Sequence, residues 1–160
     1  MKLQTFIYSI LLLTVSQGVP AAPASMCNGV VTKGNTVQAC ARLERAELNG
    51  ARLSGRDLKG IQLLRSELRK ADLSASDLRQ AGLQFVDLHR GNLSRSDLRG
   101  ANLHEAKLYK TDLRDADLRG ANLRKARLTG AQLQGARFDD QTVLPFSKEK
   151  AIELGMLYQP

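Results

Sequence analysis

The sequence is organised by a leucine that returns every fifth residue from Leu43 to the end of a long central segment. Positions 43 to 138 in steps of five hold nineteen Leu residues and one Phe, which is Phe138. A second series of small residues, mostly Ala, precedes these positions by two residues, as at Ala41 and Ala46. The apolar positions are therefore spaced alternately by two and by three residues, and the fold must bury both series.

Neither an α-helix nor a flat β-strand can bury this pattern. A helix has about 3.6 residues per turn, so a step of five rotates each leucine by about 140° from the previous one. A strand repeats every two residues, so a step of five sends successive leucines to opposite faces. A spacing of two fits a short extended segment, and a spacing of three requires a corner. Five residues therefore make one side and one bend of a solenoid.

Longer repeats indicate the number of sides in each coil. Asp-Leu followed by a basic residue recurs at 57–59, 77–79, 97–99 and 117–119, and the sequence Leu-Arg-Gly-Ala-Asn-Leu occurs at both 98–103 and 118–123. Both patterns recur every twenty residues, which equals four of the five-residue repeats. We call each five-residue repeat a phrase. We therefore predict an all-β solenoid with four sides per coil, in which residues 41–140 form about five coils.

The phrase Ala-(Asp/Asn)-Leu-x-Gly, as at Ala101-Asn102-Leu103 and again at 121–123, resembles the repeat of the pentapeptide-repeat family. The resemblance covers residues 41–140. It implies a right-handed quadrilateral β-helix, and the handedness comes from the resemblance alone. Some proteins of that family protect DNA gyrase by mimicking duplex DNA with acidic surfaces, so the resemblance also implies a DNA-mimicking regulator of a topoisomerase as an alternative function.

Residues 1–24 have the features of a secretory signal peptide. Lys2 precedes an apolar run at 6–15, which is too short to span a bilayer. The small residues Ala-Pro-Ala at 22–24 predict cleavage after Ala24, with cleavage after Ala21 and an uncleaved membrane-surface anchor as alternatives. We therefore expect an exported protein, periplasmic or secreted, whose mature chain has no transmembrane segment.

Residues 25–40 hold both cysteines of the chain, Cys27 and Cys40. Two cysteines after a signal peptide favour a disulfide. The ends of a solenoid expose unpaired backbone and apolar side chains, so they need caps. We predict that residues 25–40 form an N-terminal cap closed by this disulfide. A reactive dithiol or a metal site is the alternative, but no histidine lies near either cysteine in the sequence.

The five-residue phrase stops after Asp140, and residues 141–160 are predicted to form a C-terminal cap. Ser147 suits the N-cap of a short helix from about Lys148 to Leu154, and Gly155 suits its end. The preferred role for this helix is to cover the last coil. A helix that binds a partner is the alternative.

Four aspartates recur in one column of the predicted coil, and a basic residue follows each of them by two positions. The acidic column is Asp57, Asp77, Asp97 and Asp117, and the basic column is Lys59, Arg79, Arg99 and Arg119. Stacking would place the carboxylates about 5 Å apart, as in a retaining glycosidase. An enzyme that uses this carboxylate ladder is therefore an alternative function, although two ladders of opposite charge explain the pattern better.

No other pattern in the sequence indicates catalysis. His89 and His104 fall on different sides of the coil, and no phosphate-binding loop or metal-ligand spacing occurs. We therefore predict a non-enzymatic protein without a metal or cofactor. The formal net charge of +8 at pH 7 and the export signal oppose an acidic DNA-mimic and make nucleic acid an unexpected partner. They favour an anionic envelope surface or an acidic protein.

Two surface features are candidate binding sites. Stacking in fours would align six residues into a basic ridge with ring groups, suited to phosphate or carboxylate: Arg69, Lys70, His89, Arg90, Tyr109 and Lys110. A plain solvated edge is the alternative interpretation of this ridge. Leu64 and Phe85 occupy outward positions on neighbouring coils and form a candidate apolar contact for a partner.

Overall fold

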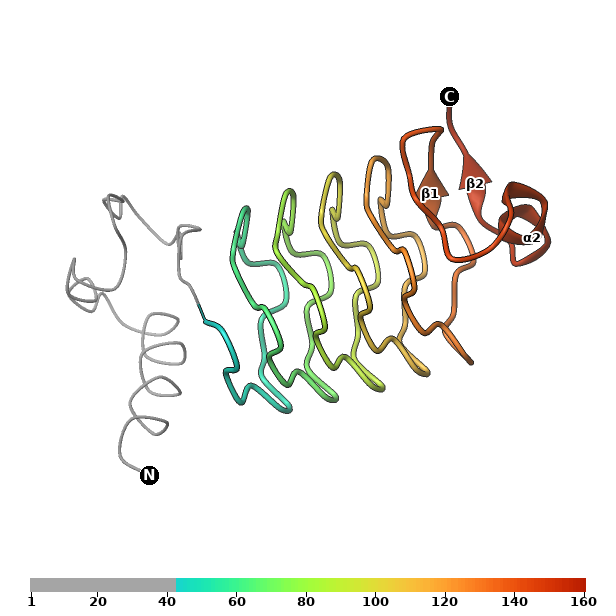
Figure 1. Cartoon of the computed structure of the whole chain (residues 1–160). Helices are drawn as coiled ribbons and strands as arrows, with labels where there is room; N and C mark the ends of the chain where they lie inside the picture. Colours follow the sequence, from blue (N-terminus) through green and yellow to red (C-terminus); the bar gives the residue numbers. More distant parts are fainter. Residues whose placement is uncertain (1–42) are drawn as a thin grey trace, which may run out of the picture.

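The computed structural model describes residues 43–160. The predicted signal peptide (1–24), the N-terminal cap (25–40) and the disulfide between Cys27 and Cys40 lie outside the described residues. From Leu43 onward the chain winds into coils that stack along one axis, and the C-terminus lies at the far end of this stem (Figure 1).

Neighbouring coils are joined by parallel backbone bridges between residues twenty apart. Glu47 is bridged to Glu67, and the same offset continues along every side of the stem. The backbone N–H of Leu48 donates to the carbonyl of Glu67 at 2.7 Å, and the N–H of Glu67 donates to the carbonyl of Ala46 at 2.8 Å. The predicted four-phrase period is therefore the observed register, and each outward position forms a column with the residue twenty ahead.

Each corner of the coil is a tight turn that follows a leucine. In the first described corner, the N–H of Ala46 donates to the carbonyl of Leu43 at 3.2 Å. The third residue of each turn has a positive φ, as at Lys70 (58°), Gln80 (58°) and Gly100 (65°), which type II turns require. A residue other than glycine pays about 1–2 kcal/mol for this conformation. Among the described residues with positive φ none is β-branched, in keeping with that cost.

The Asp or Asn that precedes each leucine shapes the same corner from its side chain. Its Oδ1 accepts a hydrogen bond from the backbone N–H two residues later, as between Asn102 and the N–H of His104 at 3.1 Å. The same bond recurs after Asp57, Asp72, Asp77, Asp87, Asn92, Asp97, Asp112, Asp117 and Asn122. Short acidic and amide side chains favour such local turns, which explains their place in the phrase.

The leucines fill a continuous core along the stem axis. Those in the middle of the stem, such as Leu88 and Leu98, have no exposed surface, whereas Leu43 and Leu128 near the two ends are only partly buried. Some of the small residues two positions before a leucine are Ser or Thr, and their hydroxyl groups form hydrogen bonds inside the stem. The Oγ of Ser96, for example, donates to the carbonyl of Leu93 at 2.7 Å. Each buried leucine contributes about 1.5–3 kcal/mol.

The C-terminal segment packs against the last coil. Strand β1 (Arg137–Phe138) pairs in parallel with β2 (Leu157–Tyr158), and α2 (Lys148–Glu153) lies between them in sequence. The Oγ of Ser147 accepts a hydrogen bond from the N–H of Lys150, so Ser147 is the N-cap of α2. Figure 1 shows α2 and β2 together at the C-terminal end. A membrane-crossing helix, one both long and apolar enough, does not occur between residues 43 and 160.

Candidate functional site

The two predicted charge ladders lie side by side on one face of the stem. Bridges join Asp57 to Asp77, Asp77 to Asp97 and Asp97 to Asp117, so the carboxylates form one column. Each arginine pairs with the aspartate of its own phrase. Arg99 donates from Nε to Asp97 Oδ1 at 2.9 Å and from Nη2 to Oδ2 at 2.6 Å. Arg79 and Arg119 bind Asp77 and Asp117 with the same side-on geometry.

The ladders are also linked between coils. Arg79 Nε lies 3.7 Å from Asp97 Oδ2, and Arg137 Nη2 lies 3.4 Å from Asp117 Oδ2. The hydrogen bond from Arg79 lowers the pKa of Asp77. Burial opposes ionisation of Asp117, but hydrogen bonds from Arg119 hold the pKa of this carboxyl below its usual value. A glycosidase needs one protonated carboxyl group as its acid, and these lowered pKa values do not favour that role.

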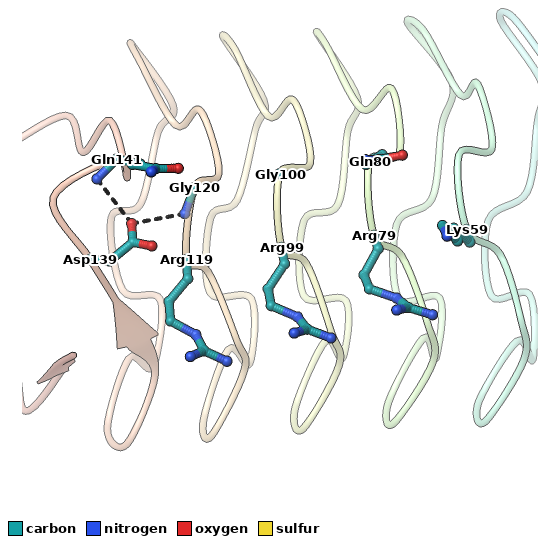
Figure 2. A pocket seen from close by; sticks show the side chains of 9 residues that line it. All are labelled: Lys59, Arg79, Gln80, Arg99, Gly100, Arg119, Gly120, Asp139 and Gln141. Atoms are coloured by element: carbon teal, nitrogen blue, oxygen red, sulfur yellow. Dashed lines mark hydrogen bonds between the residues drawn. The ribbon is translucent and has the colours of Figure 1, made fainter. Parts of the chain in front are cut away.

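A groove runs along the corner next to the basic column, with a volume of about 480 Å³. We call it the arginine groove, and it is lined by Lys59, Arg79, Gln80, Arg99, Gly100, Arg119, Gly120, Asp139 and Gln141. Figure 2 shows the three arginine side chains extending in parallel, one from each successive coil. Gly100 and Gly120 have no side chains to fill the corner, which leaves it open.

The C-terminal end of the arginine groove is formed where the repeat register changes. Asp139 Oδ1 accepts hydrogen bonds from the N–H groups of Gly120 at 2.9 Å and Gln141 at 3.1 Å, as Figure 2 shows. Beyond this point Asn122 is bridged to Val143, an offset of twenty-one residues instead of twenty. The extra residue lets Asp139 and Gln141 close this end of the corner.

The six residues of the predicted basic ridge stack on another edge of the stem. The N–H of Lys70 donates to the carbonyl of His89 at 3.0 Å, and the N–H of Arg90 donates to the carbonyl of Tyr109 at 2.9 Å. Lys70, Arg90 and Lys110 are exposed and occupy the same positive-φ corner on successive coils. Their side chains have no carboxylate partner among the described residues.

The other members of the basic ridge are tied to neighbouring side chains. Arg69 Nη2 lies 2.9 Å from Asp87 Oδ2, so Asp87 offsets part of the ridge's positive charge. The rings of His89 and Tyr109 have centroids 6.3 Å apart. The hydroxyl oxygen of Tyr109 accepts a hydrogen bond from Arg127 Nη1 at 3.1 Å, which raises the pKa of Arg127 and adds a cation beside the ridge.

The outward apolar residues Leu64 and Phe85 lie one position apart in the coil. Phe85 is 38% exposed, and its ring contacts two polar neighbours: Arg65, 5.4 Å from the ring centroid, and His104, whose ring meets it edge-on at 5.9 Å. Leu64 is half-buried in the next column. The Phe85 ring thus lies between Arg65 of its own column and His104 of the neighbouring column, and it offers a partner only a small apolar surface.

The five-residue repeats match a known protein family. The chain matches the family described as "Pentapeptide repeats" in eight copies, over residues 46–84, 81–120 and 101–140. The chain belongs to the pentapeptide-repeat family. Pentapeptide-repeat proteins fold as right-handed quadrilateral β-helices, so the predicted fold class is confirmed at this level.

Two solved pentapeptide-repeat proteins resemble this one over most of its length. Rfr23 from the cyanobacterium Cyanothece 51142 is 31% identical, covers 69% of this chain with 68% of its own, and has a TM-score of 0.53. A protein from the thylakoid lumen of Arabidopsis thaliana is also 31% identical, covers 71% of this chain with 75% of its own, and has a TM-score of 0.61. A comparison with curated protein sequences returned no match.

The repeat sequence predicts the columns of this pentapeptide-repeat protein but not the arginine groove. The sequence feature that could have predicted the groove is the dipeptide Arg-Gly, which occurs at 99–100 and at 119–120. It places a long basic side chain beside a corner residue without a side chain on two successive coils. Within the part of the chain that the structure describes, no three His, Cys, Asp or Glu residues are grouped so that they could hold a metal ion.

Proposed function

We propose that this pentapeptide-repeat protein is an exported, non-enzymatic module that binds anionic envelope surfaces through the basic ridge. Members of the family are generally non-catalytic structural or interaction modules, which agrees with this role. The observation that carries the proposal is the column of Lys70, Arg90 and Lys110. These are three exposed cations on successive coils, without carboxylate partners among residues 43–160.

The stem holds these cations in a fixed row. Their backbone positions are set by the hydrogen bonds between coils, so on the protein side an anion needs to order only the side chains. Lys and Arg near an anionic membrane surface each contribute about 1 kcal/mol. Phospholipid headgroups are therefore the surface we propose, and an acidic protein is the competing partner. The DNA-mimicking alternative needs an acidic surface, which a chain with a net charge of +8 does not favour.

We expect the triple variant Lys70→Gln, Arg90→Gln, Lys110→Gln to bind anionic vesicles roughly 100-fold more weakly than the unmodified chain, because three cations are lost. Gln fits this turn position, since Gln80 already adopts a φ of 58° at an equivalent corner. The measurement is co-sedimentation with vesicles that contain phosphatidylglycerol, at several salt concentrations. Binding by the unmodified chain should weaken as salt rises.

The matched control removes three cations from the same turn position on other edges: Arg45→Gln, Arg65→Gln, Arg95→Gln. All three have φ values of 57–58°, so the backbone change is equivalent. This control should retain most of the binding. Equal loss in both variants would mean that only net charge matters, and the ridge proposal would fail. Binding to an acidic protein but not to vesicles would replace the lipid surface with that partner.

Export is the second part of the proposed function. The structure of a similar protein from the thylakoid lumen supports the view that this fold serves outside the cytosol. We expect mass spectrometry of the periplasmic or secreted protein to find a mature chain that begins at Ser25. Leu12→Arg, which interrupts the apolar run of the signal peptide, should keep the chain uncleaved. Full-length unmodified protein found only in the cytosol would contradict export and would favour the topoisomerase alternative.

A further inference from the structure

The arginine groove lies on the edge of the stem opposite the basic ridge. Ten residues, or two of the four sides, separate Arg69 from Arg79 and His89 from Arg99. We propose that the arginine groove binds a linear acidic polysaccharide, whose carboxylates dock on the guanidinium groups of Arg79, Arg99 and Arg119. This site is distinct from the basic ridge and does not depend on the ridge proposal.

Each guanidinium in the groove has one occupied edge and one open edge. A guanidinium carries five N–H groups in a planar fork. The aspartate of the same phrase takes the Nε edge, as in the Arg119 contacts with Asp117 at 2.9 and 2.6 Å. No described residue accepts a hydrogen bond from Nη1 of Arg79, Arg99 or Arg119. The edge formed by Nη1 and Nη2 is therefore available to bind a second carboxylate with two hydrogen bonds.

These open edges are presented in a fixed row. The side-on aspartates orient the guanidinium groups, and the side chains of Arg79, Arg99 and Arg119 remain 39%, 44% and 33% exposed. Holding an arginine in its bound orientation reduces the entropy that a ligand must overcome. Figure 2 shows the three side chains parallel to one another, so their free ends face the same way.

The spacing of the row favours a sugar polymer over other chains. Stacked coils are about 4.8 Å apart. One pyranose ring of a linear 1,4-linked chain spans nearly this distance, so carboxylates on successive or alternate rings meet arginines one or two coils apart. Same-face side chains of an extended peptide recur at about 6.6–6.8 Å. Phosphates on one strand of duplex DNA advance only about 3.4 Å along the helix axis per nucleotide, and they wind around the duplex instead of forming a straight row. Neither of these spacings matches the row.

The charge balance of the groove also favours geometric recognition over simple attraction to any polyanion. The aspartates beside Arg79, Arg99 and Arg119 neutralise most of their charge, and Asp139 lies at one end. A ligand therefore gains more from paired hydrogen bonds than from long-range attraction. The amides of Gln80 and Gln141 line the same groove and supply hydrogen-bond partners for sugar hydroxyls.

The test is calorimetric titration of the mature chain with a short oligogalacturonate and with its methyl ester. We expect the acid form to bind and the ester to bind at least tenfold more weakly, since the ester lacks the charged carboxylate. The triple variant Arg79→Lys, Arg99→Lys, Arg119→Lys keeps every positive charge but removes the fork. This variant should also lose at least about tenfold in affinity for the acid form.

Two further variants separate the groove from the ridge and from loss of fold. Lys70→Gln, Arg90→Gln, Lys110→Gln should leave oligogalacturonate binding unchanged. Gly100→Asn fills the corner with a side chain that tolerates positive φ, so it should weaken binding while the arginines stay intact. Circular dichroism checks that each variant is folded.

Three results would each overturn the polysaccharide proposal. The first is no binding of the acid form by the unmodified chain. The second is unchanged binding by the folded lysine variant, which would show that charge alone suffices. The third is equal competition by polyglutamate or oligothymidylate, which would show a general polyanion site.

Discussion

Leu88→Ala is expected to lower the free energy of unfolding by about 3–5 kcal/mol. Leu88 has no exposed surface and lies between Leu68 and Leu108, which are equally buried. The coils above and below cannot move together to fill the cavity. Their separation is fixed by hydrogen bonds such as those from the N–H of Leu68 to Asp87 O at 2.7 Å and from the N–H of Leu88 to Lys107 O at 2.9 Å. Denaturant unfolding followed by circular dichroism measures the loss.

Leu128→Ala is the matched control for this prediction. Leu128 belongs to the same column, but it is only partly buried near the C-terminal end of the stem. Removing its side chain leaves less of a closed cavity, so the expected loss is below about 2 kcal/mol. Equal losses at the two positions would show that burial along the leucine column does not set the stability of the stem.

The architecture of the stem could be predicted because the five-residue period admits few backbone paths. Leucines at steps of five exclude both a single helix and a single strand for this segment. The sequence pattern that recurs every twenty residues predicts the register between coils, as seen in the bridge between Glu47 and Glu67. The turn residues agree with this path as well. Glycine recurs at corners such as Gly100 and Gly120, where φ is positive. Local and long-range signals in this segment therefore point to one structure.

The pairing of the charge ladders could be predicted only in part. Their columns follow from the register, but the contacts depend on side-chain conformation. Arg99 binds both oxygens of Asp97 in its own phrase and only approaches Asp117 of the next coil, at 3.9 Å. No sequence period distinguishes these two partners. The open edge of each guanidinium, on which the polysaccharide proposal depends, follows from this choice.

The repeat pattern could not predict how the arginine groove ends or which residues Phe85 contacts. The five-residue repeat stops after Asp140, but the sequence does not show that the carboxylate of Asp139 accepts a hydrogen bond from the N–H of Gly120. That contact depends on the single-residue shift before Val143. The repeat likewise marks Phe85 as outward but cannot choose its neighbours. The ring contacts Arg65 and His104, which the column positions bring within reach.

Met156→Asp is expected to release the C-terminal segment and promote association between copies of the chain. Met156 is 3% exposed, so an aspartate there would bury an unpaired charge at a cost of several kcal/mol. The segment around it covers the backbone of the last coil. Gly155 O accepts from the N–H of Gly135 at 2.9 Å, and the N–H of Leu157 donates to Ala136 O at 2.8 Å. Loss of these bonds exposes an edge that can pair with another chain.

Ile152→Asp provides the control, because it makes a similar change on α2 at a side chain that is 54% exposed. Size-exclusion chromatography with light scattering compares the variants over a range of concentrations. Ile152→Asp should keep the association state of the unmodified chain, whereas Met156→Asp should form larger species as concentration rises. If Met156→Asp changes neither stability nor association, the contacts of Met156 do not protect the end of the stem. If both variants associate, the cause is the added charge and not the loss of a buried contact, since Met156 is buried and Ile152 is exposed.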